Sequence, residues 1–177
     1  MEPTLVIFSG LPGTGKSTLA NRLARELHWA LLRIDDLTTD VPEDAGTRFW
    51  DEKIQVLLQL AECQLELGLN VILDSVFMGN DRLHAQELAR GNQAFFRPIY
   101  CFVSDESIWE QRVTQRFEML HNPAVATWER IKKQSKRFLE WEPGTALFVD
   151  AVQPIEQNYA TLHRYVTDQD ILHIPSH

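Results

Sequence analysis

The stretch Gly10-Leu11-Pro12-Gly13-Thr14-Gly15-Lys16-Ser17, followed by Thr18, decides how the rest of this sequence is interpreted. It fits the pattern G-x-x-x-x-G-K-[ST] of a phosphate-binding P-loop, the Walker A motif. Its glycines permit backbone angles that a Cβ atom would forbid, so successive N–H groups can turn onto phosphate oxygens. We expect residues 10–18 to bind a nucleoside triphosphate, with Lys16 on the β- and γ-phosphates and Ser17 on Mg2+.

The segments on either side of this stretch provide the context that the motif needs. Residues 4–8 are a short apolar run rich in strand-forming residues, and residues 19–27 carry apolar side chains at helical spacing. The loop is therefore predicted to lie between a buried strand and the start of a helix. The N-terminus of that helix adds a partial positive charge where the phosphates would bind.

The remainder of the chain alternates between apolar strands and amphipathic helices. Further strands are predicted at 30–34, 69–73, 98–103 and 145–149, with a short edge strand at 171–174, and helices at 47–67, 81–89, 104–117, 124–139 and 155–166. The strands are continuous apolar runs, which is typical of a parallel sheet with helices on both faces. The sequence thus predicts one three-layer α/β domain over residues 1–177, with ligands at the carboxyl ends of the strands.

Composition limits the possible partners. The chain has 177 residues, of which 44% are hydrophobic and 24% charged, and a net charge of −8 disfavours a long nucleic acid partner. No apolar run approaches the roughly 20 residues that span a bilayer, and the first strand leaves no room for a signal peptide, so a cytoplasmic protein is expected. Cys63 and Cys101 form no C-x-x-C pattern and are predicted to be buried, reduced thiols.

Three absent patterns narrow the chemistry beyond nucleotide binding. The chain has no N-K-x-D tetrapeptide for guanine recognition, its third predicted strand ends in Asp74-Ser75 rather than Asp-Glu, and it has no room for a second domain that could be moved. These absences argue against a GTPase and against a mechanical ATPase. A small phosphotransferase remains as the favoured class.

Acidic residues follow two of the predicted strands. Asp35 and Asp36 end the second strand, where a carboxylate could take the proton from an acceptor hydroxyl during attack on the γ-phosphate. Either residue could act as this base, and both could instead be solvated acids or a helix cap. Asp74 is expected near the Mg2+ water shell or the acceptor, with a turn-capping role as the alternative.

Arginines provide candidates for phosphate and acceptor contacts. Arg112 and Arg116 are four positions apart and share one helix face, from which they could clamp the phosphates when a lid of about residues 112–137 closes. The alternative is a solvated face that pairs with nearby glutamates. Arg48 and Arg82 could contact the acceptor. Trp50 and Phe77 are expected near the acceptor pocket, although ordinary core packing is the favoured explanation for most of these aromatic residues.

Taken together, these motifs resemble the small P-loop kinases related to the kinase domain of phage polynucleotide kinase. The resemblance rests on the P-loop, on residues 33–36, on residues 74–77 with Arg82, and on residues 112–116, and it extends from Leu5 to about Val166. Gluconate kinases, adenylylsulfate kinases, chloramphenicol phosphotransferase and zeta toxins are close to this group. The resemblance implies a P-loop NTPase fold with a five-stranded parallel sheet in order 2-3-1-4-5, and a short helical lid.

The same resemblance implies roles for individual residues. Asp35 matches the base that activates the acceptor hydroxyl, Arg116 matches the lid arginine that stabilises the transition state with Arg112 beside it, and Asp74 matches the carboxylate after strand three. The loop after Asp150 would lie near adenine. Residues 38–50, where the acceptor is expected, match no motif of the group.

Three functions remain open from the sequence. The first is an ATP- and Mg2+-dependent kinase that phosphorylates a hydroxyl of a small molecule or nucleotide. The second is a kinase of nucleic-acid 5′-hydroxyl ends, which needs a basic channel that leads to Asp35. The third is a nucleotide-binding regulatory module that hydrolyses ATP slowly or not at all. No membrane partner is expected, and the sequence specifies no oligomeric state.

Overall fold

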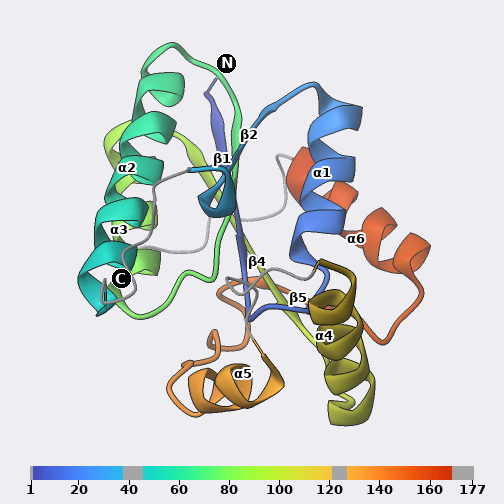
Figure 1. Ribbon diagram of the computed structural model, residues 1–177. Coiled ribbons are helices and arrows are strands. Elements are labelled where there is room, and N and C mark those ends of the chain that lie inside the picture. The colour runs from blue at the N-terminus through green and yellow to red at the C-terminus, as the bar shows by residue number, and fades with distance from the viewer. Residues whose placement is uncertain (1, 38–45, 121–126, 169–177) are drawn as a thin grey trace.

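A computed structural model describes residues 2–37, 46–120 and 127–168, without the side chains of residues 46–48 and 120. The elements alternate as the sequence predicts (Figure 1). Their order is β1 (Thr4–Ser9), α1 (Lys16–Leu27), β2 (Ala30–Arg33), a 3-10 turn η1 (Ile34–Asp36), α2 (Gly46–Glu66), β3 (Val71–Asp74), α3 (Asn80–Gly91), β4 (Phe95–Phe102), α4 (Glu106–Leu120), α5 (Trp128–Ser135), β5 (Leu147–Asp150) and α6 (Ile155–Thr167).

The five strands form one parallel sheet in the order β2-β3-β1-β4-β5, which confirms the predicted topology. Alternate residues of β1 serve opposite faces of the sheet. Leu5 and Ile7 pack under α2 and α3, whereas Val6 and Phe8 pack under α1 and α6. Because both faces are covered, β1 is buried along its whole length, as its continuous apolar sequence predicts.

Helix α2 buries the face that its sequence predicts. Its inward residues are Ile54, Leu57, Leu58, Ala61 and Leu65. The prediction for Cys63 was wrong, because Cys63 lies on the outward face of this helix and is exposed, whereas Cys101 in β4 is buried as expected. A predicted helix does not reveal the burial of a residue that lies off its core-facing stripe.

The boundaries of two elements differ from the predictions. Helix α5 ends at Ser135 instead of continuing to Leu139, because the chain turns there and buries Phe138 against Tyr100. Strand β4 begins at Phe95, three residues before the predicted start. The start of the predicted helix at 124–126, the predicted strand at 171–174 and part of the predicted acceptor region at 38–45 lie outside the described residues.

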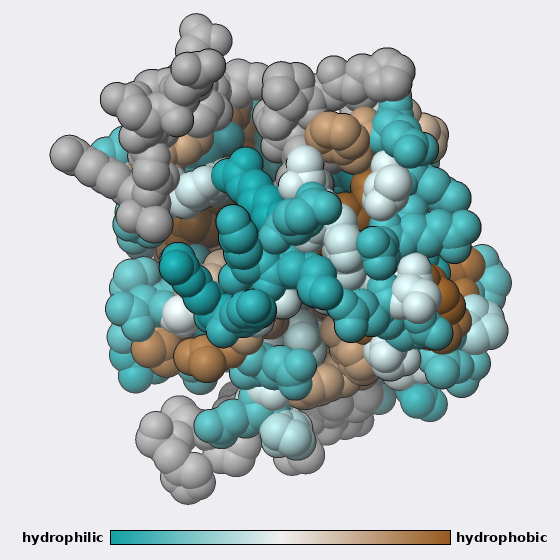
Figure 2. Space-filling model, turned by 60° about the horizontal axis from the view of Figure 1, so that its bottom comes forward, coloured by the Kyte–Doolittle hydropathy of each residue, from teal (hydrophilic) through white to brown (hydrophobic). Residues whose placement is uncertain are grey.

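The carboxyl ends of the strands, the P-loop, α4 and α5 lie at the lower end of the molecule in Figure 1. Seen from that end, hydrophilic side chains cover the middle of the face and hydrophobic side chains form patches toward its edges (Figure 2). Exposed basic residues of α5 and the turn after it are Arg130, Lys132, Lys133, Lys136 and Arg137. Among the described helices, none is both long and apolar enough to cross a membrane.

Candidate active site

The P-loop joins the end of β1 to the start of α1, and its glycines have the backbone angles that the motif requires. Gly10, Gly13 and Gly15 all have positive φ, at 134°, 83° and 82°. A Cβ atom on Gly10 would lie 2.1 Å from the carbonyl oxygen of Cys101 in β4. Glycine is therefore needed at position 10 both for its conformation and for the close approach of two backbone segments.

The N-terminus of α1 has the features of an anion-binding site. No side chain caps this end of the helix, and its first turn contains no acidic residue. The first N–H groups of a helix have no partner within the helix, and the helix dipole favours negative charge at this end. The loop and the helix start therefore fit a phosphate group.

Lys16 lies inside this loop and is almost fully buried. Its ammonium donates to the carbonyl oxygen of Leu11 at 2.9 Å, and the Thr14 hydroxyl donates to the same oxygen at 2.8 Å. Burial lowers the pKa of Lys16, while the negative charge of Asp74 acts in the opposite direction. A desolvated ammonium in this position interacts strongly with any anion that enters the loop.

Asp74 ends β3 directly beside Ser17. It is buried between Phe8 of β1 and Arg33 of β2, its register partners, and its carboxylate accepts a hydrogen bond from the Ser17 hydroxyl. Burial raises the pKa of Asp74, and the charge of Lys16 and the Ser17 hydrogen bond partly offset this effect.

Asp74 and Ser17 fit Mg2+ as a donor set. Mg2+ prefers oxygen ligands and usually takes only one or two from the protein, with water and phosphate for the others. No cluster of three or more metal-ligating side chains occurs in the described part of the chain. The two oxygen donors beside the P-loop suit a metal that arrives with a nucleotide rather than one held by the protein alone.

The two acids after β2 differ in their contacts. Asp36 is held by Arg33, whose Nε and Nη2 atoms donate to its two carboxylate oxygens at 2.8 and 2.7 Å. Asp35 is exposed, and among the described residues it has no hydrogen bond or ion pair. Its charge nevertheless acts on the pKa of both Lys16 and Asp74, so it lies close to them.

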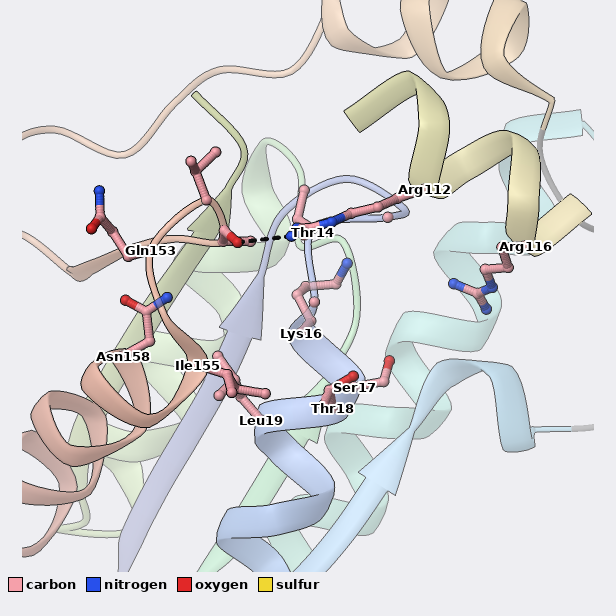
Figure 3. Close-up of a pocket in the computed structure, with 14 residues that line it drawn as sticks. Thr14, Lys16, Ser17, Thr18, Leu19, Arg112, Arg116, Gln153, Ile155 and Asn158 are labelled. Carbon is pink, nitrogen blue, oxygen red and sulfur yellow. Dashed lines mark hydrogen bonds between the residues drawn. The ribbon is translucent and has the colours of Figure 1, made fainter. Parts of the chain in front are cut away.

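Helix α4 contributes both predicted arginines to a cavity of about 440 Å³ that runs along the P-loop. Arg112 points toward the loop after β5 and donates from Nη2 to the carbonyl oxygen of Ala151 at 3.0 Å (Figure 3). Arg116 lies one turn further along and points toward the opening near Ser17. No hydrogen bond or ion pair holds Arg116 within the described residues.

The loop after β5 and the first turn of α6 form the other wall of this cavity, across from Ser17 (Figure 3). The loop contributes Ala151, Val152 and Gln153 to the lining, and α6 contributes Ile155 and Asn158. Asp150 shapes the loop, because its carboxylate accepts hydrogen bonds from Ser104 N, Ser104 Oγ and Val152 N. This position is where the resemblance places a nucleobase, and that placement stays a prediction.

The contact between Trp109 and the P-loop was not predicted from the sequence. The indole N–H of Trp109 donates to the carbonyl oxygen of Pro12 at 2.8 Å, and its ring packs edge-on against Trp128 of α5 at 5.1 Å between centroids. Val113, one turn later, packs against Gly13. The only available signal was that Trp109, Arg112 and Val113 share one face of the predicted helix, which does not specify what the face touches.

The predicted acceptor residues lie apart from the cavity lining. Arg82 is half-buried between the rings of Phe138 and Trp141 and donates to the carbonyl oxygens of Phe77 and Leu139. Phe77 is fully buried with a φ of 49°, so it belongs to the core. Trp50 is exposed at the start of α2. The side chain of Arg48 lies outside the described residues.

Comparison with protein families agrees with this geometry. The family model AAA_33, an AAA domain, matches residues 5–140. The chain belongs to this family of small P-loop kinase domains. Among curated protein sequences, no significant match is found.

Solved structures share the fold at low sequence identity. A candidate kinase from Chloroflexus aurantiacus aligns with a TM-score of 0.72 and 24% identity, covering 92% of this chain and 96% of that one. The APS kinase CysC from Mycobacterium tuberculosis, solved with AMPPNP and APS, aligns with a TM-score of 0.68 and 17% identity, covering 93% of this chain and 97% of that one. A gluconokinase from Sinorhizobium meliloti aligns with a TM-score of 0.66 and 14% identity, covering 93% of this chain and 92% of that one.

Proposed function

We propose that this chain is a kinase that transfers the γ-phosphate of ATP to a hydroxyl group of a small molecule or nucleotide. Membership of a P-loop kinase family and the phosphate-binding geometry of residues 10–18 support the nucleotide half of this proposal. The APS kinase neighbour was solved with AMPPNP, which supports an ATP-type nucleotide. Its ligand APS and the gluconokinase neighbour support a small-molecule acceptor.

The contrast between Asp35 and Asp36 carries the acceptor half of the proposal. An acceptor that is a hydroxyl must lose a proton as it attacks, and a carboxylate within hydrogen-bond reach can take it. Asp36 is engaged by Arg33, whereas Asp35 is exposed beside Lys16 and Asp74. Of the two candidate bases that the sequence left open, the contacts favour Asp35.

The proposed reaction is a single displacement at the γ-phosphorus. The Asp35 carboxylate takes the proton of the acceptor hydroxyl, the acceptor oxygen forms a bond to the γ-phosphorus, and the bond from that phosphorus to the β–γ bridging oxygen breaks. The bond electrons leave with ADP. Lys16 and Arg116 provide positive charge for the oxygens of the phosphoryl group in transit.

Mg2+, when bound, would neutralise phosphate charge, and Ser17 and Asp74 are the residues that would hold it or its water shell. Asp74 also orients the Ser17 hydroxyl through their hydrogen bond. Asp74 is buried, whereas Ser17 is partly exposed toward the cavity.

The test is an ATP-consumption assay over a panel of sugars, nucleosides, antibiotics, adenylylsulfate and short oligonucleotides, with product phosphorylation confirmed by mass spectrometry. The Asp35→Asn variant should retain ATP binding and lose about a hundredfold or more of the transfer rate, the scale of general-base removal. Asp36→Asn is the matched control, one residue away, and should change transfer by less than about tenfold.

Each other result has a distinct meaning. Unchanged transfer in Asp35→Asn would remove Asp35 from the reaction. Transfer only to oligonucleotide ends would favour the 5′-hydroxyl kinase. Tight ATP binding without transfer to any acceptor would favour a regulatory module and overturn the proposal.

A further inference from the structure

Helices α1 and α6, which both border the nucleotide cavity, are joined by a row of polar side chains. Arg22 of α1 donates from Nη1 and Nη2 to the two carboxylate oxygens of Glu156 in α6, both at 2.8 Å. The hydroxyl of Tyr159 donates to Glu26 at 2.6 Å, and His163 Nε2 lies 3.4 Å from the other oxygen of the same carboxylate. We call these five residues the α1–α6 seam.

Arg22 makes two kinds of contact in this seam. Its guanidinium forms the bidentate pair with Glu156, and its central carbon lies 3.8 Å from the ring centroid of Tyr159. A planar guanidinium can stack on an aromatic ring while its N–H groups bind a carboxylate, which a lysine ammonium cannot do. Exposed ion pairs usually contribute little, but bidentate geometry within a network is the exception. Arg22 therefore constrains the orientation of α6 as well as attracting it.

The seam continues the cavity-facing side of each helix. Thr18, Arg22 and Glu26 are separated by four positions, so they lie on one face of α1, and Thr18 lines the cavity. On α6, the cavity-lining residues Ile155 and Asn158 are each followed directly by a member of the seam. A change at the seam is therefore transmitted over less than one helical turn to the wall of the cavity.

The first turn of α6 is not anchored in the core. The buried residues of this helix begin one turn later and are Tyr159, Leu162 and Val166. No side-chain hydrogen bond caps the N-terminus of the helix. Asn158 ties the turn to β5, since its Nδ2 donates to the carbonyl oxygen of Asp150 at 2.8 Å. The tie to α1 is the pair between Arg22 and Glu156.

We propose that Arg22 is a positioning residue for nucleotide binding, which holds the first turn of α6 in place through Glu156. The proposal rests on the proposed function, because it takes the cavity as the ATP site. A triphosphate bound by residues 10–18 leaves its nucleoside to extend along the cavity toward the opposite wall, where Ile155 lies (Figure 3). Arg22 is not among the described residues that line the cavity, so it acts through the wall that it positions.

This role separates two parts of the ligand. The phosphates contact the P-loop and the start of α1, whereas the nucleoside contacts the wall to which α6 contributes. Displacing the first turn of α6 should weaken the contacts with the nucleoside and leave those with the phosphates intact. A side chain that merely stabilised the fold would not distinguish the two parts.

The test compares ATP with tripolyphosphate, each with Mg2+, in calorimetric titrations of the full chain. Tripolyphosphate presents a run of three phosphates without a nucleoside. In Arg22→Glu the new carboxylate faces Glu156 and Glu26, and like-charge repulsion should push the two helices apart. We expect this variant to lose at least about fivefold more affinity for ATP than for tripolyphosphate.

Arg25→Glu is the matched control on the same helix. Arg25 is in the last turn of α1, is exposed, and has no hydrogen bond or ion pair within the described ranges of the chain. The substitution makes the same change in net charge, so it corrects for the weaker attraction of any anion to a more negative protein. It should lower both affinities by the same factor, below about twofold, because an exposed charge is screened by salt.

A double-mutant cycle tests whether Arg22 acts through Glu156. Arg22→Gln and Glu156→Gln each break the bidentate pair, and each should lower ATP affinity about two- to fivefold. The double variant should bind ATP about as well as Arg22→Gln alone, because the pair is already lost. Losses that multiply would show that the two residues act independently, and would overturn the proposal.

The remaining outcomes are also distinct. Equal losses of ATP and tripolyphosphate affinity in Arg22→Glu would overturn the positioning role, and so would an unchanged affinity for ATP. A wild-type protein that binds tripolyphosphate as tightly as ATP would refute the positioning role and leave the P-loop as a phosphate site. A wild-type protein that binds neither ligand would refute the proposed function as well. Cooperative unfolding in urea checks that each variant is folded.

Discussion

The indole N–H of Trp109 donates a hydrogen bond to the carbonyl oxygen of Pro12, 2.8 Å away. This bond joins α4, which presents Arg112 and Arg116, to the P-loop over 97 positions of sequence. Val113 reinforces the contact, since a Cβ atom on Gly13 would lie 2.8 Å from its Cγ2. The position of the arginine helix and the shape of the phosphate loop therefore depend on each other.

Removing this hydrogen bond should weaken nucleotide binding. We expect Trp109→Phe to lower ATP affinity about three- to tenfold in calorimetric titration, the scale of one hydrogen bond, because Pro12 loses its link to α4. Trp128→Phe is the control, as it keeps an aromatic ring against Trp109 without touching the P-loop. Equal losses in the two variants would mean that aromatic packing, and not the bond to Pro12, matters.

Gly10 should be the least replaceable glycine of the loop for stability. In Gly10→Ala the new Cβ atom would lie 2.1 Å from a backbone oxygen of β4, which cannot move without breaking the sheet. Gly144→Ala is a matched control, because Gly144 also has a positive φ, of 86°, but has no atom within 4 Å of the added carbon. Conformational strain alone costs about 1–2 kcal/mol. We expect Gly10→Ala to lower the free energy of unfolding in urea by at least about 2 kcal/mol more than the control.

Several features of the site were predictable because they depend on local sequence. The P-loop motif specifies a strand, a turn that needs glycine, and a helix N-terminus within 20 residues. The continuous apolar strands specify a doubly covered sheet, so the acids that follow β2 and β3 had to meet at its carboxyl edge. Asp35 and Asp74 do lie near Lys16.

The remaining features depend on contacts between distant segments. The partner of Trp109 lies 97 positions away, and that of Arg82 at Leu139 lies 57 positions away, and neither pairing leaves a periodic pattern. The exposure of Cys63 depends on where α2 sits on the sheet. Whether Asp35 or Asp36 is available depends on the rotamer of Arg33, which residue type alone does not determine.

Arg82 was predicted to contact the acceptor, but its observed contacts indicate that it holds the segments around Phe77 and Leu139 in place. Its guanidinium donates to Phe77 and Leu139 and lies 4.9 and 4.7 Å from the ring centroids of Phe138 and Trp141, and burial lowers its pKa. Lysine keeps the charge but not the planar fork. We expect Arg82→Lys to lower the free energy of unfolding by about 1–3 kcal/mol in urea. Unchanged stability with a raised KM for the acceptor would instead show a substrate contact.

The two cysteines should react with thiol reagents at very different rates. Cys101 lies buried in β4 behind Gly10, and burial raises its pKa to about 12. At pH 8 only about one Cys101 in ten thousand would be a thiolate, the reactive form. In an aromatic-disulfide titration we expect one rapid equivalent, from the exposed Cys63, which Cys63→Ser removes. Because a thiol with a raised pKa stays protonated, Cys101 should still react slowly when the pH is raised to 10. Equal reaction rates for the two cysteines would contradict the burial of Cys101.

The two arginines of α4 should have separable effects. Arg112 donates to Ala151 in the loop that lines the nucleotide cavity, so Arg112→Ala should lower ATP affinity about three- to tenfold. Arg116 points to the opening near Ser17 and has no partner among the described residues, so under the proposed reaction its charge would be available to the transferred phosphoryl group. Arg116→Ala should lower the transfer rate about a hundredfold while ATP affinity changes less than about threefold. Calorimetry and single-turnover rates measure the two quantities separately, and a reversed pattern would exchange the assigned roles.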